Sequence, residues 1–488
     1  MKRTLAAACA FVVTFVVVAV PTHAATKRLA STLCVGGGGC YSTIQAAVDA
    51  AHDGDTIRIG PGTFAGGVKI PKSINVLGAG SNRTIIKGGG PVLTIGTWNS
   101  PVQPSSVSIR GVTVTGGDNR TFPDPVHARG GGIFTANGLD ADGNPVPGAS
   151  VTITDSVIAG NRVQPSDTCC DGFAFAGGAG IESHGNLTLI NDAVRDNRAG
   201  PDVAYAGGGG IRQFEGSLTL RHTIVTNNEV VATPPLAVAG WGAGIIVDGC
   251  CGSVVIADSE ISGNRVSVTS TYPDYSGVTA SGAALDFDES HTGPVTVTNT
   301  RITGNSVTAI NSVGDANANS IVYINAGSPL VLRDSVISGN RVTASGSTDV
   351  FACVGLEVNS RASIDDTQIT DNAVFATATA GDIYAACGAF NAASADGVLL
   401  SNSLVANNRV EVSASGSATV GGAGITNLGV LQLRDTKVAN NRGRVTAQSG
   451  TVYGGGIFNS SFIDGLDAVL TLTNSTVIGN VVTGSPVR

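Results

Sequence analysis

One short phrase recurs along the chain and constrains the fold more than any other feature. It reads TDSVIAGNRV at 154–163, ADSEISGNRV at 257–266 and SNSLVANNRV at 401–410. Three residues before its Asn the side chain is always Ile or Val, and eight before it is always Ile, Leu or Val. Six residues before the Asn, nine of the ten copies have Asp or Asn. Five residues before it, nine of the ten have Ser or Thr. Columns that recur about every 35 residues predict a repeat architecture. The ten anchoring residues are Asn161, Asn197, Asn228, Asn264, Asn305, Asn340, Asn372, Asn408, Asn441 and Asn480.

Each copy of the phrase predicts two short strands joined by a turn. Alternating apolar residues ten and eight places before the Asn favour one strand, and the Ile or Val three places before it begins a second. The Asp/Asn-Ser/Thr pair favours a turn, because short polar side chains bond their own backbone there. We expect the Asn to be a corner with left-handed backbone angles and to bond the next copy in a ladder.

Glycine clusters upstream of most copies predict a third strand. Examples are GGAGIES at 177–183, GGGGIRQ at 207–213 and GAGIIVD at 242–248. They do not form a phosphate-binding loop, since no helix follows and no Lys-Ser/Thr completes the motif. We expect them to allow a tight turn and close packing against the neighbouring copy.

Three strands per repeat make one coil of a solenoid whose inward Ile, Val and Leu fill the axis. Parallel crossovers are overwhelmingly right-handed. The predicted fold is therefore all-β, a single-stranded right-handed parallel β-helix. The segment TIQAAVDAAHDGD (43–55) predicts an amphipathic helix, with Ile44, Ala47, Val48 and Ala51 on one face, that caps the first coil.

The start of the chain predicts secretion. Residues 1–24 combine a basic start, an apolar stretch at 11–20 and a small-residue cleavage site, as in a signal peptide. We therefore divide the chain into a signal peptide at 1–24, an N-terminal cap at 25–57 and the β-helix at 58–488, and we expect an extracellular or cell-surface location. No integral membrane segment is expected after signal removal. The net charge of −8 becomes about −10 then, which argues against nucleic acid as a partner.

Eight cysteines would remain in an oxidising compartment, and disulfides are the better interpretation than a zinc site. Cys353 and Cys387 lie at equivalent positions of successive coils, so we predict that they are bonded. The connectivity of Cys169, Cys170, Cys250 and Cys251 is left open.

Two resemblances cover nearly all of the mature chain. The stretches TIQAAVDAAHDGDTIRIGPGTF (43–64) and KSINVLGAGSNRTII (72–86) resemble the N-terminal cap and first coils of the pectin-lyase-like superfamily. The GGAGI and I/V-x-x-N repeats resemble those of polymorphic outer-membrane proteins, with Ile or Val in place of the usual Phe. The first resemblance implies that a substrate would lie along one sheet and its flanking loops. The sequence motifs typical of polygalacturonases and pectate lyases are not evident.

The outward positions of the glycine-led strand are the candidate functional face. If its first Ile points inward, the next residue and the one two places further point outward. The catalytic candidates are Asp248, Asp286 and Asp288, and we expect Asp248 and Asp288 to lie one rung, about 5 Å, apart. Two carboxylates at such a short distance could raise each other's pKa or share a calcium ion. No metal site or cofactor is otherwise indicated. The binding candidates are Glu182, His184, Arg212, Tyr323 and Glu357. The alternative is that this face is simply solvated, with its acids beside Arg212 and His184.

Two functions remain open at this point. The first is a secreted, non-catalytic, adhesin-like β-helix that binds an extracellular glycan or a cell-surface protein through variable segments such as TSTYPDYSGVTAS (269–281). The second is a polysaccharide lyase or glycoside hydrolase that works from the outward face. A groove lined by clustered acids plus Arg212 would favour the enzyme, and a flat face with dispersed charges would favour the binding protein.

Overall fold

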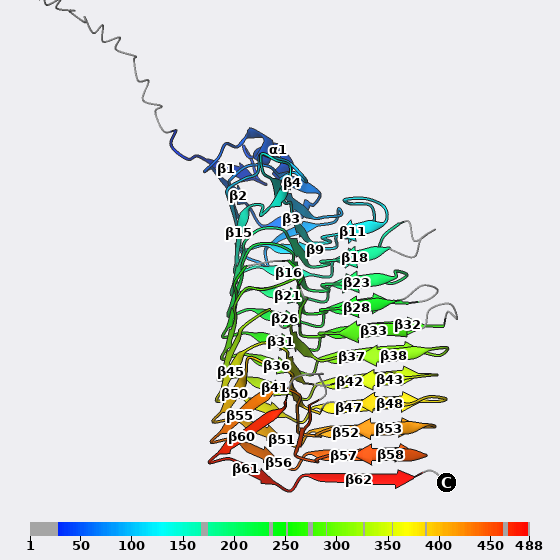
Figure 1. Ribbon diagram of the computed structural model, residues 1–488. Helices are drawn as coiled ribbons and strands as arrows, with labels where there is room; N and C mark the ends of the chain where they lie inside the picture. Colours follow the sequence, from blue (N-terminus) through cyan, green and yellow to red (C-terminus); the bar gives the residue numbers. More distant parts are fainter. Residues whose placement is uncertain are drawn as a thin grey trace, which may run out of the picture.

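The computed structural model describes residues 28–486, apart from 167–173, 234–237, 250–251, 272–276, 289, 326, 354, 386–387 and 462–466. The predicted signal peptide at 1–24, Cys387 and the four cysteines at 169–170 and 250–251 lie outside the described residues. The fold is a right-handed parallel β-helix, as predicted, whose coils stack along one axis (Figure 1).

A full coil contains five strands, not the three predicted. The coil around Asn264 contains β30 (Val254–Ala257), β31 (Glu260–Ser262), β32 (Arg265–Ser270), β33 (Gly277–Ser281) and β34 (Leu285–Phe287). Each strand pairs in parallel with its equivalents in the coils before and after it, which gives five long sheets. In the order in which one coil visits them, we number them sheets 1 to 5. They contain 14, 13, 11, 10 and 12 strands.

The two additional strands lie where we expected a variable loop. The segment at 269–281 begins at the end of β32 in sheet 3 and includes the whole of β33 in sheet 4. These two sheets pack face to face through small residues, since a Cβ added to Gly240 of sheet 4 would meet Val266 and Val268 of sheet 3. Sheets 3 and 4 therefore form a thin arm, which projects to the right in Figure 1. Ala and Gly on the inner face of sheet 4 weaken the apolar alternation from which strands are predicted.

The recurrent Asn residues form one continuous ladder inside the solenoid. Asn264 is fully buried. Its Nδ2 donates to Oδ1 of Asn305 in the next coil (3.0 Å) and to the carbonyl of Val225 in the previous one (2.9 Å). The same pattern links all ten, from Asn161 to Asn480. The predicted ladder is confirmed.

The left-handed backbone angles lie beside the ladder, so their predicted position was wrong. Positive φ occurs at the residue before the ladder Asn, as in Gly263 (62°) and Asn227 (54°). It also occurs six places before it, as in Asp258 (52°) and His222 (50°). This left-handed conformation explains the Asp/Asn column, because Asp and Asn tolerate it better than most other residues. The role of the ladder Asn is to supply a side-chain amide, which has both a hydrogen-bond donor and an acceptor.

A second ladder of side chains runs through the Ser/Thr column, and one acid interrupts it. Thr223 N, for example, donates to Oγ of buried Ser259 in the next coil (3.2 Å). Asp192 takes this position in its own coil, where it is 3% exposed and accepts from the backbone N–H groups of Ser156 (2.7 Å) and Ile190 (2.8 Å). Burial, together with the nearby charge of Asp155, raises the pKa of Asp192 to about 7 despite these two bonds.

Replacing Asp192 by Ser is expected to stabilise the protein above neutral pH. Because the pKa of Asp192 is raised on folding, from 3.8 to about 7, its favourable contribution is present below pH 4 and is lost as the pH rises to 7. That loss amounts to at most about 4 kcal/mol. Asp192→Ser should therefore raise the melting temperature most at pH 8 and least at pH 4. The matched control is Asp258→Asn, which removes an exposed carboxylate from the turn column. A gain from Asp192→Ser that does not change with pH would contradict the assignment.

The N-terminal end contains the predicted helix and a disulfide. Helix α1 (Ile44–Ala50) buries Ile44, Ala47 and Val48, and the Thr43 side chain accepts from Ala46 N at its start. It contacts β1 (Thr32–Val35), β2 (Thr56–Ile59) and β4 (Val68–Ile70), so it covers the first coils. The helix ends five residues earlier than predicted, since the backbone is already extended at Ala51 (φ −73°, ψ 161°). A disulfide joins Cys34 to Cys40.

Candidate binding groove

The candidate face lies in a concave corner between sheets 4 and 5. Several coils leave sheet 4 through a Gly with positive φ, such as Gly208 (65°) or Gly242 (57°), before they enter sheet 5. The tight turn folds the outer face of sheet 5 back towards sheet 4. Contacts across the corner include the Arg212 guanidinium over the Phe175 ring (4.7 Å) and a hydrogen bond from Ser281 Oγ to Asp286.

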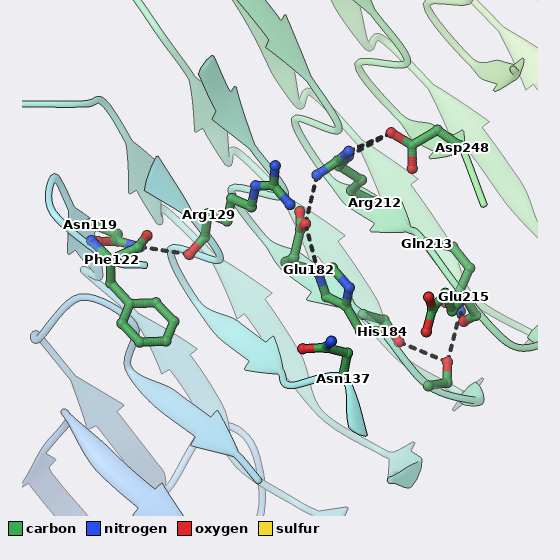
Figure 2. A network of polar contacts seen from close by, with 12 residues as sticks. Asn119, Phe122, Arg129, Asn137, Glu182, His184, Arg212, Gln213, Glu215 and Asp248 are labelled. Carbon is green, nitrogen blue, oxygen red and sulfur yellow. Dashed lines mark hydrogen bonds and ion pairs between the residues drawn. The ribbon is translucent and has the colours of Figure 1, made fainter. Parts of the chain in front are cut away.

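The N-terminal half of this corner is filled by a buried charge network (Figure 2). It is built from β19 (Ile181–Ser183), β24 (Ile211–Gln213) and the residues that follow them, together with Asp248 directly after β29 (Ile245–Val247). Arg212 Nη1 donates to Glu182 Oε1 (2.7 Å), and its Nε and Nη2 donate to Asp248 Oδ2 (2.8 and 2.6 Å). His184 Nε2 lies 3.2 Å from Glu182 Oε1. Arg212 therefore links carboxylates that are two rungs apart.

Aromatic rings enclose the network. The His184 ring lies 5.0 Å from Phe214, 5.1 Å from Trp98 and 5.6 Å from Phe134, measured between centroids. Arg212 lies between the rings of Phe175 and Phe214. This enclosure removes water, which strengthens the ion pairs but makes any unpaired charge costly.

Three of the binding candidates are thus not available at the surface. Glu182 is 0%, His184 2% and Arg212 5% exposed, so the alternative of a solvated face is wrong for this half. Burial opposes the charged form of Glu182, but Arg212 and His184 outweigh it and lower its pKa to about 2. Burial also disfavours the Arg212 cation, yet Asp248 and Glu182 raise its pKa. The arrangement stabilises the corner through contacts within the protein.

The C-terminal half of the corner is an open groove of about 450 Å³. Acidic side chains of sheet 5 line one side, namely Asp248, Asp286, Asp288 and Glu357, with Tyr323 among them. Sheet 4 supplies the other side, with Phe175, Trp241, Thr279, Ser281, Asn319 and Phe351. The structure therefore brings five of the eight site candidates together in one groove.

The register of sheet 5 fixes the spacing of these acids. Val247 of β29 (Ile245–Val247) pairs with Phe287 of β34, so the residues that follow them, Asp248 and Asp288, are one rung apart, as predicted. Asp286 pairs with Tyr323 of β39 (Val322–Ile324). Tyr323 pairs with Glu357 of β44 (Leu356–Val358), so Asp286 and Glu357 are two rungs apart, about 10 Å along the axis.

Burial raises the pKa of three acids of the groove, Asp248, Asp286 and Glu357. Burial raises the pKa of Asp286 to about 7, and the charges of Asp288, Asp248 and Glu357 add to this effect against the hydrogen bond from Ser281. Burial likewise raises the pKa of Glu357, although Ser320 Oγ donates to it (2.7 Å). Burial also raises the pKa of Asp248, while Arg212 favours its charged form. Asp286 is 4% exposed, whereas Asp288 is open to solvent.

The expectations for a metal site and for a disulfide between Cys353 and Cys387 can be compared with the described part of the chain. There, no group of three His, Cys, Asp or Glu side chains is arranged to hold a metal ion. Cys353 is disulfide-bonded, and its predicted partner Cys387 lies outside the described residues, so that pairing stays a prediction.

Sequence reasoning missed the aromatic side of the groove. Phe175, Tyr205 and Trp241 lie on sheet 4, and the rings of Tyr205 and Trp241 stack with centroids 5.9 Å apart. The signal was present in FAGG (175–178) and YAGG (205–208), where an aromatic residue precedes the glycine turn by a fixed interval. Trp241 was not among the site candidates.

No family model matches the chain, and no curated protein matches it. Among solved structures, the chain is similar to the A-modules of two Azotobacter vinelandii mannuronan C-5 epimerases, AlgE4 and AlgE6. The AlgE4 module is 11% identical with a TM-score of 0.33, and the match covers 91% of this chain and 94% of that one. The AlgE6 module is 13% identical with a TM-score of 0.26, and the match covers 91% and 95%. PfbA, a surface adhesin of Streptococcus pneumoniae, is 9% identical with a TM-score of 0.21, and the match covers 91% and 90%.

These likenesses concern the fold alone. The specific resemblance to polymorphic outer-membrane repeats stays a prediction. Within the described residues, no helix is long and apolar enough to cross a membrane.

Proposed function

We propose that this protein is a secreted glycan-binding β-helix, and that an uncharged or basic glycan chain lies in the groove between sheets 4 and 5. The observation that carries the proposal is the pairing of an aromatic side with an acidic side along one concave surface. Aromatic faces pack against the apolar faces of sugar rings, while carboxylates and amides accept and donate to hydroxyl groups. Among the residues that the structure describes, the lining contains four acids and no basic side chain that could pair with the carboxylates of a polyuronate, which disfavours pectate as the ligand.

A test of binding compares three polymers that differ in charge. Wild-type protein is expected to bind neutral β-glucan or partially acetylated chitosan, and polygalacturonate weakly or not at all in this groove. Trp241→Ala should weaken binding about 30-fold, the effect of losing an aromatic contact of about 2 kcal/mol at an interface. Isothermal titration calorimetry with soluble oligosaccharides measures this change. Tyr41→Ala, which removes a partly exposed aromatic ring at the N-terminal end, is the matched control.

Hydrolysis of the bound glycan is a second candidate, favoured by the Asp286 carboxyl. A group with a pKa of about 7 at a groove surface is suited to general acid catalysis near neutral pH. Wild-type protein would then release reducing ends from the glycan that it binds, and Asp286→Asn would abolish the release while binding remained. Absorbance of unsaturated products, with and without added calcium, distinguishes a lyase. Binding without turnover leaves the non-catalytic function.

A further inference from the structure

The outer face of sheet 3 carries a column of arginines. The first residues of its successive strands are in register from β17 (Arg162–Val163) to β57 (Arg442–Ala447). Six of these nine positions are Arg. In order the nine are Arg162, Arg198, Glu229, Arg265, Ser306, Arg341, Ala373, Arg409 and Arg442. We call these six arginines, with Arg444 two residues beyond the last, the arginine column.

Most of the column lacks a carboxylate partner. Arg198 lies 3.7 Å from Glu229, and Arg409 pairs with Glu411. The other five members have no ion pair within the described residues, and all five are exposed. From β32 onward, the described outer face of sheet 3 carries five Arg and one Glu, a local charge of +4 in a chain of net charge −8.

The contrast with sheet 1 shows that this excess charge is not a general property of the coil. Arg110, Arg221, Arg333 and Arg434 occupy an equivalent column at the ends of sheet 1 strands. There the adjacent turn supplies acids. Arg110 Nε pairs with Asp155 of the next coil (3.0 Å), and Asp334 and Asp435 directly follow Arg333 and Arg434. The turn that precedes sheet 3 supplies fewer acids, namely Asp196 and Asp371 among its described residues.

The surface along the column is hollowed at two places. One hollow of about 540 Å³ is lined by Arg162, Asp196, Arg198 and Glu229 at the corner between sheets 2 and 3. Another of about 530 Å³ lies between Arg409, Arg442 and Arg444 in the last coils. The column thus has a hollow near each of its ends.

We propose that the arginine column binds an extended anionic polysaccharide whose chain runs along the axis of the solenoid. Eight rungs separate Arg162 from Arg442, about 38 Å, so the column could contact several successive acidic sugars. Guanidinium groups bind carboxylate and sulfate in a bidentate manner. The column is one side chain wide over most of its length, which fits a linear chain better than a membrane plane. It lies on the opposite side of the arm from the groove, so this site is independent of the proposed function.

The test uses dextran sulfate and polygalacturonate, which present sulfate and carboxylate on linear glycans, with neutral dextran as the uncharged comparison. Full-length protein should bind at least one of the two anionic polymers, with an affinity that falls steeply as salt increases, and should not bind neutral dextran. The variant Arg265→Gln/Arg341→Gln/Arg409→Gln/Arg442→Gln should bind about 30-fold more weakly, if each lost contact has the usual strength of an exposed ion pair. Comparing the affinities for dextran sulfate and polygalacturonate shows whether the column prefers sulfate or carboxylate groups.

The matched control removes the same number of charges from sheet 1, as Arg110→Gln/Arg221→Gln/Arg333→Gln/Arg434→Gln. It should keep wild-type binding. Equal losses in both variants would mean that net charge alone is responsible and would overturn the proposal. So would binding of neither polymer, or tighter binding to phosphatidylserine vesicles or duplex DNA than to either glycan. Trp241→Ala should leave binding of the anionic polymers unchanged. This result would distinguish a failure of the arginine-column proposal from a failure of the groove proposal.

Discussion

Replacing Asn264 by Ala is expected to lower the free energy of unfolding by about 2–4 kcal/mol. Oδ1 of Asn264 accepts from both the backbone N–H and the Nδ2 of Asn228 (3.0 Å each). Its Nδ2 in turn donates to Asn305 and to the Val225 carbonyl. Alanine would leave the Asn228 N–H without its acceptor in a fully buried position, and each unsatisfied buried group costs about 1–3 kcal/mol.

Thermal and urea denaturation measure this loss, and hydrogen exchange of the Asn228 amide locates it. Because each coil contacts only its neighbours, we expect faster exchange in the coils of Asn228, Asn264 and Asn305 before other coils. Ser306→Ala changes a half-exposed side chain beside the ladder and is the matched control. An unchanged melting temperature for Asn264→Ala would show that the ladder does not contribute to stability.

Replacing Arg212 by Met is expected to cost about 3–5 kcal/mol at pH 7, because it leaves the fully buried Glu182 without its main partner. The pKa of Glu182 is lowered on folding, from 4.5 to about 2, so its stabilising contribution is present above pH 4.5 and is lost as the pH falls towards 2. The difference in stability between wild type and Arg212→Met should therefore be largest near neutral pH and should shrink in acid.

Two further variants separate charge from packing at Arg212. Arg221→Met removes an exposed arginine from sheet 1 and should have little effect. The combination Arg212→Met/Glu182→Gln/Asp248→Asn removes both stranded carboxylates and should recover much of the lost stability. If Arg212→Met loses as much stability at pH 3 as at pH 7, the loss comes from packing around Phe175 and Phe214 instead.

The sequence was sufficient to predict what the coils repeat. The Asn column, its apolar companions and the glycine turns occur in nearly every coil, so their structural role could be inferred without coordinates. The adjacency of Asp248 and Asp288 also followed, because equivalent positions in successive coils must stack.

What the sequence did not show is how one sheet covers another. The outward direction of Glu182 and Arg212 from their own strands was inferred correctly, but solvent exposure does not follow from it. Sheet 4 folds back over both residues, and its strands consist largely of Ala, Gly and Thr, which gave too weak an alternation to be predicted. The arginine column was visible in the recurrent Asn-Arg-Val sequence. Its missing carboxylate partners could be identified only once neighbouring columns were placed in space.

The Asn ladder also bears on how the chain can change over evolutionary time. From Asn161 to Asn480, every junction between coils uses the same donor, acceptor and backbone partners, so the junction between Asn228 and Asn264 is chemically interchangeable with that between Asn264 and Asn305. Duplication or deletion of a whole coil would preserve every remaining junction, whereas a change of a few residues inside a strand would break the register. The length of this protein can therefore change in steps of one coil, and a coil gained or lost between Asp248 and Glu357 would lengthen or shorten both the groove and the arginine column by one rung.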